Sequence, residues 1–260
     1  MTDWLAICRA AVEDVQGVLA ELPTREEREP IVGAGLGGDD TTAIDAAAER
    51  VILARLAGLG AIVSEEVGRS GKGPPLIVVD PIDGSVNAKR GLPFFSLSIA
   101  VADGWTMDDV HFGYVYDFGS GEEWHAVKGK GAFLDGKPLG PDLPKETIEL
   151  LAFEATLTSL VAERAEGMVG LAHRLRIMGS LALSLCYLAA GRVDAVCSLK
   201  GARSVDIAAG QLLARERGLA VELFEAPPFG AAPLDLEARS RLVAAGTTEL
   251  CARLADALSA

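Results

Sequence analysis

The chain has few of the residues on which several common active sites depend. Its 260 residues include only four cysteines and three histidines. The cysteines lie far apart and form no CxxC pair, which argues against a zinc site or a disulfide framework and favours reduced thiols in a cytoplasmic protein. The histidines form no HExxH pair, and the chain has neither a GxSxG motif nor a P-loop motif. We therefore expect no zinc-peptidase, serine-hydrolase or P-loop chemistry.

Basic residues and long apolar runs are also scarce. Lysine and arginine number 24 against 37 acidic residues, a net charge of −13. This balance argues against nucleic-acid binding, which depends on cationic contacts with phosphates. No uninterrupted apolar run reaches about 18 residues, so we expect no transmembrane helix, and the acidic, amphipathic start does not resemble a signal peptide. Half of the residues are hydrophobic, which is enough for a substantial core.

Apolar spacing and turn residues divide the chain into halves of different texture. The first half is expected to be α+β with antiparallel strand pairs, and the second a layered α/β arrangement of alternating strands and helices. We place the boundary near residue 145, which gives subdomains 1–145 and 146–260. The first half is predicted to hold helices 2–22 and 43–58, strands 60–64, 76–80, 94–102, 110–117 and 121–127, and tight turns over 129–139. The second is predicted to hold strands 148–153, 174–178, 193–197, 219–224 and 242–245, and helices 156–167, 180–190, 205–217 and one from about 248.

The charged, glycine-rich segment 23–42 is predicted to be a loop. Its GAGLGG stretch, residues 33–38, matches the GxGxxG pattern of dinucleotide-binding folds. That fold needs a strand before the glycines and a helix directly after them. Here a charged segment precedes the stretch, and Asp39 and Asp40 follow it, where they would repel a pyrophosphate. We therefore favour a lid over 26–42 that closes beside a phosphate site.

The most informative stretch is LIVVDPIDGSVNAKRGLP, residues 76–93. Four apolar residues predict a buried strand, with Asp80 and Asp83 at its exit, where ligands gather in open α/β sheets. Gly84 lets backbone approach a ligand closely, and Ser85 opens a short helix. Carboxylates there would bind a hard cation such as Mg²⁺, and the helix amides would bind a phosphate. The alternative is a structural turn with two capping aspartates.

Four other acidic residues are candidates for the same site. Glu65 and Glu66 end the strand predicted just before, and one of them reaches the same metal if the two strands are neighbours; a solvated acidic loop is the alternative. Asp45 and Asp206 each lie in the first turn of a predicted helix, where the helix dipole alone favours an acid. Small residues follow Asp206, which would let its helix press into a crowded site.

Together these residues resemble the inositol monophosphatase and fructose-1,6-bisphosphatase superfamily. Its Asp-Pro-Ile-Asp-Gly-Ser type signature is present over 80–85, its acidic pair at 65–66, and its Asp-x-Ala-Ala-Gly element over 206–210. GSLALSLCYLAAGRVDA (179–195) and KGKGAFLDGKPL (128–139) are similar to two further family stretches. Ser85 in place of Thr, Val205 in place of Trp, and TAIDAAAE over 42–49 resemble the archaeal-type enzymes that act on both fructose 1,6-bisphosphate and inositol phosphates.

The resemblance implies a layered αβαβα sandwich and a set of site residues. The metal ligands would be Glu65, Asp80, the carbonyl of Ile82, Asp83 and Asp206, holding two or three Mg²⁺ ions, with Mn²⁺ as a substitute. Asp45 and Ser85 would orient the attacking water, and the amides of Gly84 and Ser85 would hold the phosphate. In archaeal-type relatives, basic residues near the positions of Arg176 and Lys200 contact the substrate, and Arg203 is a third candidate. Ordinary surface charge is the alternative for all three.

We therefore predict hydrolysis of a sugar or cyclitol phosphate monoester by metal-activated water. Fructose 1,6-bisphosphate stands ahead of inositol 1-phosphate as the substrate. The alternatives are a nucleotide phosphatase of the 3′-phosphoadenosine 5′-phosphate type and an interaction protein with residual phosphatase activity. The resemblance also implies a homodimer or a tetramer, a small anionic phosphate ester as partner, and no nucleic acid or membrane.

Overall fold

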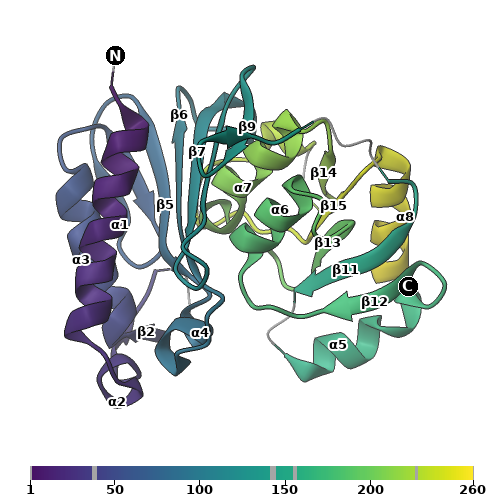
Figure 1. The fold of residues 1–260 in the computed structure, drawn as a ribbon, viewed down its shortest axis with the longest axis horizontal. Coiled ribbons are helices and arrows are strands. Elements are labelled where there is room, and N and C mark those ends of the chain that lie inside the picture. The colour runs from purple at the N-terminus through teal and green to yellow at the C-terminus, as the bar shows by residue number, and fades with distance from the viewer. Residues whose placement is uncertain (1, 37–39, 141–144, 155–156, 226–227, 260) are drawn as a thin grey trace.

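The computed structural model describes residues 2–36, 40–140, 145–154, 157–225 and 228–259. Two sheets alternate with layers of helices (Figure 1), which confirms the αβαβα arrangement predicted from the sequence. Helices α1 (Trp4–Glu21) and α3 (Ala43–Leu56) lie outside the first sheet, α6 (Leu181–Ala189) and α7 (Ser204–Glu216) lie between the sheets, and α8 (Thr248–Ser259) lies outside the second.

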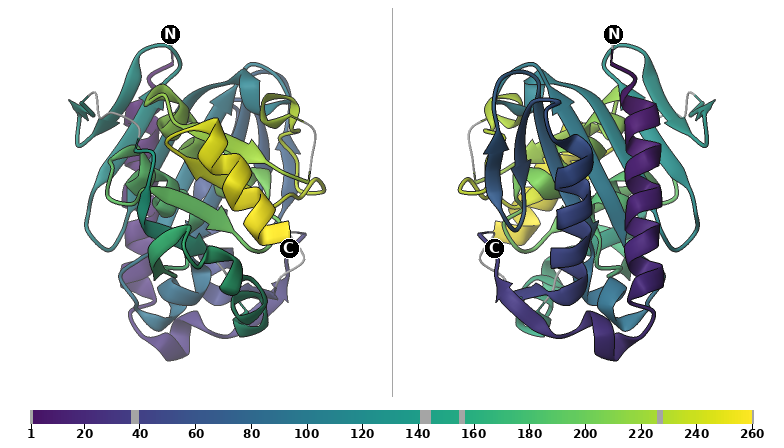
Figure 2. Two further views of the ribbon diagram at one scale, coloured as in Figure 1. Left: turned by 90° about the vertical axis from the view of Figure 1, so that its right-hand side faces the viewer. Right: turned by 90° about the vertical axis from the view of Figure 1, so that its left-hand side faces the viewer.

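The first sheet has eight strands in the order β10-β9-β8-β7-β6-β5-β3-β4. All neighbours are antiparallel except β3 and β5, which run parallel. Figure 2 shows α1 and α3 along its outer face, where their apolar side chains pack on those of β5 and β6. The strands are β3 (Ala61–Ser64), β4 (Gly68–Gly71), β5 (Leu76–Asp83), β6 (Ser96–Ala102), β7 (Val110–Asp117), β8 (Glu123–Val127), β9 (Gly131–Leu134) and β10 (Lys137–Pro138).

The second sheet has five strands in the order β12-β11-β13-β15-β14. β11 runs parallel to β12 and β13, and the remaining pairs are antiparallel. The strands are β11 (Ile148–Glu154), β12 (Ala172–Arg176), β13 (Ala195–Ser198), β14 (Ala220–Leu223) and β15 (Leu242–Ala245). Helix α5 (Thr158–Arg164) follows β11, and short 3-10 helices span Met107–Asp109, Glu166–Met168 and Phe229–Ala231.

Close packing joins the two halves through the middle helices. A Cβ atom on Gly210 of α7 would lie 2.8 Å from the Cβ of Leu185 in α6, so only glycine lets these helices approach so closely. Similarly, a Cβ on Gly113 of β7 would lie 2.8 Å from the carbonyl oxygen of Ala209 in α7. The small residues after Asp206 therefore press the start of α7 against the first sheet.

The prediction of a loop over 23–42 is wrong. Helix α2 (Arg25–Arg28) and an antiparallel hairpin of β1 (Ile31–Ala34) and β2 (Asp40–Thr42) lie within it. α2 forms because Thr24 and Glu27 cap its first turn, with the Thr24 amide donating to Glu27 Oε2 at 3.0 Å. Residues 37–39, part of the GAGLGG stretch and of the expected lid, lie outside the described residues.

Other differences are smaller. The turns predicted over 129–139 contain the β9–β10 hairpin, and β4 was not predicted because GRSG has no apolar alternation. The helix predicted over 156–167 begins at Thr158, and residues 155 and 156 lie outside the described residues. All four cysteines are free and buried, and burial raises the pKa of each thiol, so none is a reactive thiolate. Among the described residues, no helix is both long and apolar enough to cross a membrane.

Candidate metal and phosphate site

Strand pairing places the first carboxylates side by side. β3 and β5 are parallel, and Ser64 pairs with Val79, so the residues that follow, Glu65 just after β3 and Asp80 within β5, lie at the point where the pairing of the two strands ends. This is the carboxyl edge of the strands, where ligands bind in open α/β sheets. Asp80 is 1% exposed. Its pKa is raised well above the usual range by burial and then by the negative charges of Glu65, Asp83 and Asp206.

A β-bulge brings Asp83 to the same face as Asp80. In a regular strand, residues three apart point to opposite faces. Here Asp80 pairs with Ser98 and Asp83 pairs with Ser96, so three steps along β5 match two steps along β6. The extra residue restores the alternation, and both carboxylates face the second half of the molecule. The Ile82 amide donates to Asp80 Oδ1 at 2.9 Å and stiffens this turn.

Asp83 forms hydrogen bonds with the second half of the chain. Its Oδ2 accepts hydrogen bonds from Ser180 Oγ at 2.5 Å and from the Ala182 amide at 2.7 Å, at the start of α6. Burial and the charge of Asp206 raise the pKa of Asp83 to about 7, although these two hydrogen bonds oppose the shift. Neither Ser180 nor the Ala182 amide was predicted to contact Asp83, because the stretch 179–195 indicates only a likeness to the family.

Arg203 lies among the carboxylates. Its guanidinium contacts Glu65 Oε1 at 2.5 Å and Asp206 Oδ1 at 3.0 Å, and only 12% of its side chain is exposed. The Arg203 amide also donates to Asp206 Oδ2 at 2.8 Å, which caps the start of α7. Burial raises the pKa of Glu65 to about 8; Arg203 opposes this shift, and Asp206 and Glu66 reinforce it. Arg203 therefore pairs with Glu65 and Asp206 at once.

Asp45 and Ser85 do not contact each other in this structure. Asp45 Oδ2 accepts from Thr42 Oγ1 at 2.5 Å and from the Thr42 amide at 3.2 Å, while its buried Oδ1 finds no hydrogen-bond partner among the described residues. Ser85 Oγ donates to the carbonyl of Ile82 at 3.0 Å. Close by, Thr41 Oγ1 donates to Glu66. The dyad of Asp45 and Ser85 therefore stays a prediction.

The start of α4 (Ser85–Arg90) offers backbone amides to an anion. Gly84 precedes it with φ 95°, a conformation that favours glycine, and a Cβ there would lie 3.0 Å from the carbonyl oxygen of Gly179. The first amides of a helix have no partner within the helix. The close approach of Gly84 to Gly179 sets this turn tightly between the two halves of the chain.

The distal basic residues lie in a different environment. Arg176, at the end of β12, is exposed, and its Nη1 donates to the carbonyl of Leu175 at 2.9 Å. Lys200, just after β13, is also exposed. Arg203, grouped with them in the sequence analysis, is instead buried among the predicted metal ligands.

The donor set fits a divalent cation by its chemistry. Glu65, Asp80, Asp83 and Asp206 supply oxygen ligands only, the kind that Mg²⁺ prefers, and their mutual repulsion gives a bound cation a large electrostatic advantage. As the side chains stand, no three His, Cys, Asp or Glu residues of the described ranges have the geometry to hold one ion. Arg203 lies between Glu65 and Asp206, and Asp83 points toward α6, so these carboxylates do not converge on one point.

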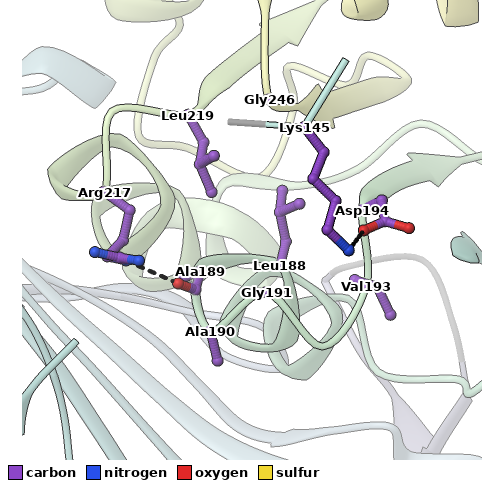
Figure 3. Close-up of a pocket in the computed structure, with 10 residues that line it drawn as sticks. All are labelled: Lys145, Leu188, Ala189, Ala190, Gly191, Val193, Asp194, Arg217, Leu219 and Gly246. Carbon is purple, nitrogen blue, oxygen red and sulfur yellow. Dashed lines mark hydrogen bonds and ion pairs between the residues drawn. The ribbon is translucent and has the colours of Figure 1, made fainter. Parts of the chain in front are cut away.

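A separate cavity of about 370 Å³ lies at the other end of α6 and shares no lining residue with this cluster (Figure 3). Lys145 and Asp194 form an ion pair of 2.6 Å on its wall, and Arg217 Nε donates to the carbonyl of Ala189 at 2.9 Å. Its charged groups thus have partners within the protein. The four clustered carboxylates, rather than this cavity, define the candidate site.

Comparison with known proteins identifies the family. The sequence model of the inositol monophosphatase family matches residues 5–260. A fructose-1,6-bisphosphatase/inositol-1-monophosphatase of Methanothermobacter thermautotrophicus is 34% identical over 98% of this chain and 96% of its own length. The solved structure of an inositol monophosphatase–fructose 1,6-bisphosphatase has a TM-score of 0.86 at 27% identity, covering 98% of this chain and 100% of its own. A bifunctional NADP phosphatase/NAD kinase of Methanocaldococcus jannaschii is 28% identical over 81% of this chain and 43% of its own length.

The chain belongs to the inositol monophosphatase family. It is a phosphatase, an enzyme that hydrolyses phosphate monoesters, as its relatives are by name.

Proposed function

We propose that the enzyme is Mg²⁺-dependent and hydrolyses a sugar or cyclitol phosphate, with fructose 1,6-bisphosphate as the first candidate substrate and inositol 1-phosphate as the second. The observation that carries the proposal is the cluster of four acids, in which Asp80 and Asp83 are buried and Glu65 and Asp206, each with 13% of its side chain exposed, both pair with Arg203. The names of the relatives, fructose-1,6-bisphosphatase/inositol-1-monophosphatase, support the choice of substrates.

The proposed ligands come from both halves of the chain. Glu65, Asp80, the carbonyl of Ile82 and Asp83 belong to the proposed subdomain 1–145, and Asp206 to 146–260. Together they would hold two or three Mg²⁺ ions, or Mn²⁺ in their place. Bound there, the ions would stabilise negative charge on the phosphate and lower the pKa of a coordinated water.

The chain's own residues would orient the reactants. Asp45 Oδ1 is buried and has no hydrogen-bond partner among the described residues, and it would accept a hydrogen bond from the attacking water. Ser85 Oγ would share this task after leaving the carbonyl of Ile82, to which it now donates. The amides of Gly84 and Ser85 would hold the phosphate. Oriented proton transfer of this kind contributes about 10²–10⁴-fold to a rate.

Substrate selection would fall to basic residues around the site. Arg176 and Lys200 are exposed and would bind a distal phosphate or sugar hydroxyls, with Arg suited to phosphate through its planar fork. Arg203 would release Glu65 and Asp206 to the metal and turn toward the substrate phosphate. We also propose that the enzyme is a homodimer, with a tetramer as the alternative; size-exclusion chromatography with light scattering distinguishes them.

A nucleotide phosphatase is the second candidate. The bifunctional NADP phosphatase/NAD kinases of Methanocaldococcus jannaschii and Methanococcus maripaludis are 28% and 30% identical to this chain over 81% and 83% of its length. This similarity favours an adenine nucleotide that carries an extra monoester phosphate, such as NADP or 3′-phosphoadenosine 5′-phosphate.

A phosphate-release panel tests the proposal. The purified chain is incubated with fructose 1,6-bisphosphate, inositol 1-phosphate, NADP or 3′-phosphoadenosine 5′-phosphate, with Mg²⁺ and with a chelator in its place. We expect release from the first two that stops with the chelator. Preferential release from the nucleotides would instead select the second candidate. No release from any substrate would overturn both candidates and favour an interaction protein.

A further inference from the structure

The turn Met178–Ser180 connects the second half of the chain to the candidate site. Ser180 caps α6, since its Oγ accepts from the Leu183 amide at 3.2 Å. The same Oγ donates to Asp83 Oδ2 at 2.5 Å. The position of this turn therefore determines the direction in which the Asp83 carboxylate points.

A buried carboxylate outside the predicted ligand set holds this turn. Glu154, the last residue of β11, is 7% exposed. Its Oε2 accepts from the Gly179 amide at 2.8 Å, and its Oε1 accepts from the Met178 amide at 3.4 Å and from Ser184 Oγ in α6 at 2.7 Å. One carboxylate thus joins the end of a strand, the turn and the first helical turn of α6.

The turn is also held from the opposite side. Asn87 of α4 donates its Nδ2 hydrogens to the carbonyls of Met178 and Phe94, each at 2.7 Å. Gly179 has φ 90°, and a Cβ there would lie 3.0 Å from Asn87 Nδ2, so the turn fits without spare room. Glu154 binds its amides and Asn87 binds one of its carbonyls. Losing either set of bonds would let Ser180 move.

We propose that Glu154 is a positioning residue of the phosphatase: it fixes the turn Met178–Ser180, and through Ser180 it holds the Asp83 carboxylate in the direction needed for metal binding. The inference rests on the proposed function, because it takes Asp83 to be a metal ligand. Glu154 does not touch the reacting atoms. A carboxylate accepts several amides at once, whereas the amide of a glutamine offers one oxygen and turns its NH₂ group toward other donors.

The test compares Glu154→Gln with a matched control, Asp194→Asn. Asp194, drawn beside Lys145 in Figure 3, is also 7% exposed. It also accepts two backbone amides, those of Glu149 and Leu150, but at the opposite end of β11. Mn²⁺ binding to the full chain is measured by calorimetry, with steady-state kinetics and thermal unfolding alongside. We expect Glu154→Gln to weaken Mn²⁺ binding about tenfold and to lower kcat, and Asp194→Asn to leave both unchanged.

A double-mutant cycle separates positioning from general loss of structure. If Glu154 acts through Ser180, adding Glu154→Gln to Ser180→Ala weakens Mn²⁺ binding little further, because the hydrogen bond from Ser180 to Asp83 is already lost. Fully additive effects, or unchanged Mn²⁺ binding in Glu154→Gln, would overturn the proposal. Ser184→Ala leaves the Glu154 carboxylate in place and removes one donor. If Glu154→Gln fails to fold, Ser184→Ala is expected to weaken binding about threefold, and unchanged binding in it would overturn the proposal.

The failure of this inference is distinguishable from failure of the proposed function. If the wild-type enzyme is active and Glu154→Gln leaves Mn²⁺ binding unchanged, only the role of Glu154 is overturned. A wild-type chain that releases no phosphate overturns the proposed function. In that case the Mn²⁺ titration still tests whether Glu154 controls the Asp83 site.

Discussion

Asp194 and the four carboxylates of the candidate site differ in how fully the protein matches their negative charge. Asp194 has a full set of partners: the Lys145 ammonium at 2.6 Å and two backbone amides at 2.9 Å. Although burial acts to raise it, the pKa of Asp194 lies below its usual value because these partners stabilise the ionised form. At the candidate site, Arg203 pairs with two of the four acids, Glu65 and Asp206, and burial raises the pKa of Glu65, Asp80 and Asp83.

This difference in charge matching distinguishes a carboxylate that stabilises the fold from carboxylates that bind a cation. A carboxylate whose charge is matched within the protein holds segments together and needs nothing more. A group of carboxylates whose charge is not matched costs stability, and such groups are typical of sites that bind a cation. The following experiments test this difference between Asp194 and the carboxylates of the candidate site.

The largest effect is expected from removing a proposed ligand. Asp83→Asn or Asp206→Asn should lower phosphate release by about 10³-fold or more, equivalent to about 4 kcal/mol of transition-state stabilisation. The thermal stability of the metal-free Asp83→Asn protein should stay the same or rise, because this substitution removes a like charge. Near-normal activity of both variants at limiting Mg²⁺ would refute the ligand assignment.

Removal of the shared cation should destabilise the metal-free protein. Arg203→Gln leaves Glu65 and Asp206 without their ion-pair partner, so we expect unfolding in urea to become easier by about 3 kcal/mol, with Mg²⁺ restoring part of the loss. Arg9→Gln is the control, because it breaks the pair with Glu123 in which the Arg9 side chain is 54% exposed, and should cost less than about 1 kcal/mol. Equal losses in the two variants would contradict the special position of Arg203.

The matched carboxylate should matter for stability alone. Asp194→Asn weakens the contacts with Lys145 and with the amides of β11, and we expect it to lower the free energy of unfolding by about 2 kcal/mol. Phosphate release and Mn²⁺ binding should not change. A loss of activity without a loss of stability would show that the two groups of carboxylates are not different in kind.

The smallest effect is the pH dependence of the metal-free protein. The pKa rises from 3.8 to about 7 for Asp83 and from 4.5 to about 8 for Glu65 on folding. Because the folded state holds these protons more tightly, their contribution favours folding at low pH and is lost between about pH 4 and pH 8. We therefore expect the melting temperature without metal to fall over this range, less steeply in Asp83→Asn, and Mg²⁺ to stabilise the protein more at pH 8 than at pH 5. A melting temperature that rises with pH throughout would contradict these shifts.

Most of the fold follows from local sequence patterns. The run Leu76–Val79 predicts a buried strand because it is apolar throughout, and all eight residues of β5 are buried. The β1–β2 hairpin escaped prediction because its strands have only four and three residues, too few to show an apolar alternation. The end of β5 at Asp83 also escaped, since a bulge depends on pairing with β6.

The site residues likewise include some that local sequence patterns predict and others that they do not. Asp80 and Asp83 follow from a strand exit that can be recognised in the sequence, and Glu65 from the strand beside it. The ion pair of Arg203 with Glu65 joins residues far apart in the chain, and a lone arginine in the sequence gives no sign of it. Glu154 likewise acts on a turn 24 or 25 residues away. Such contacts depend on how two sheets pack, which local periodicity does not encode.

Binding of divalent metal by Glu65, Asp80, Asp83 and Asp206 is tested most directly by anomalous diffraction from crystals soaked with Mn²⁺ and inorganic phosphate. We predict Mn²⁺ peaks between Asp80, Asp83 and Asp206, with phosphate at the start of α4 and the Arg203 guanidinium moved away from Glu65. Crystals that bind Mn²⁺ only elsewhere, with Arg203 still paired to Glu65 and Asp206, would contradict the account.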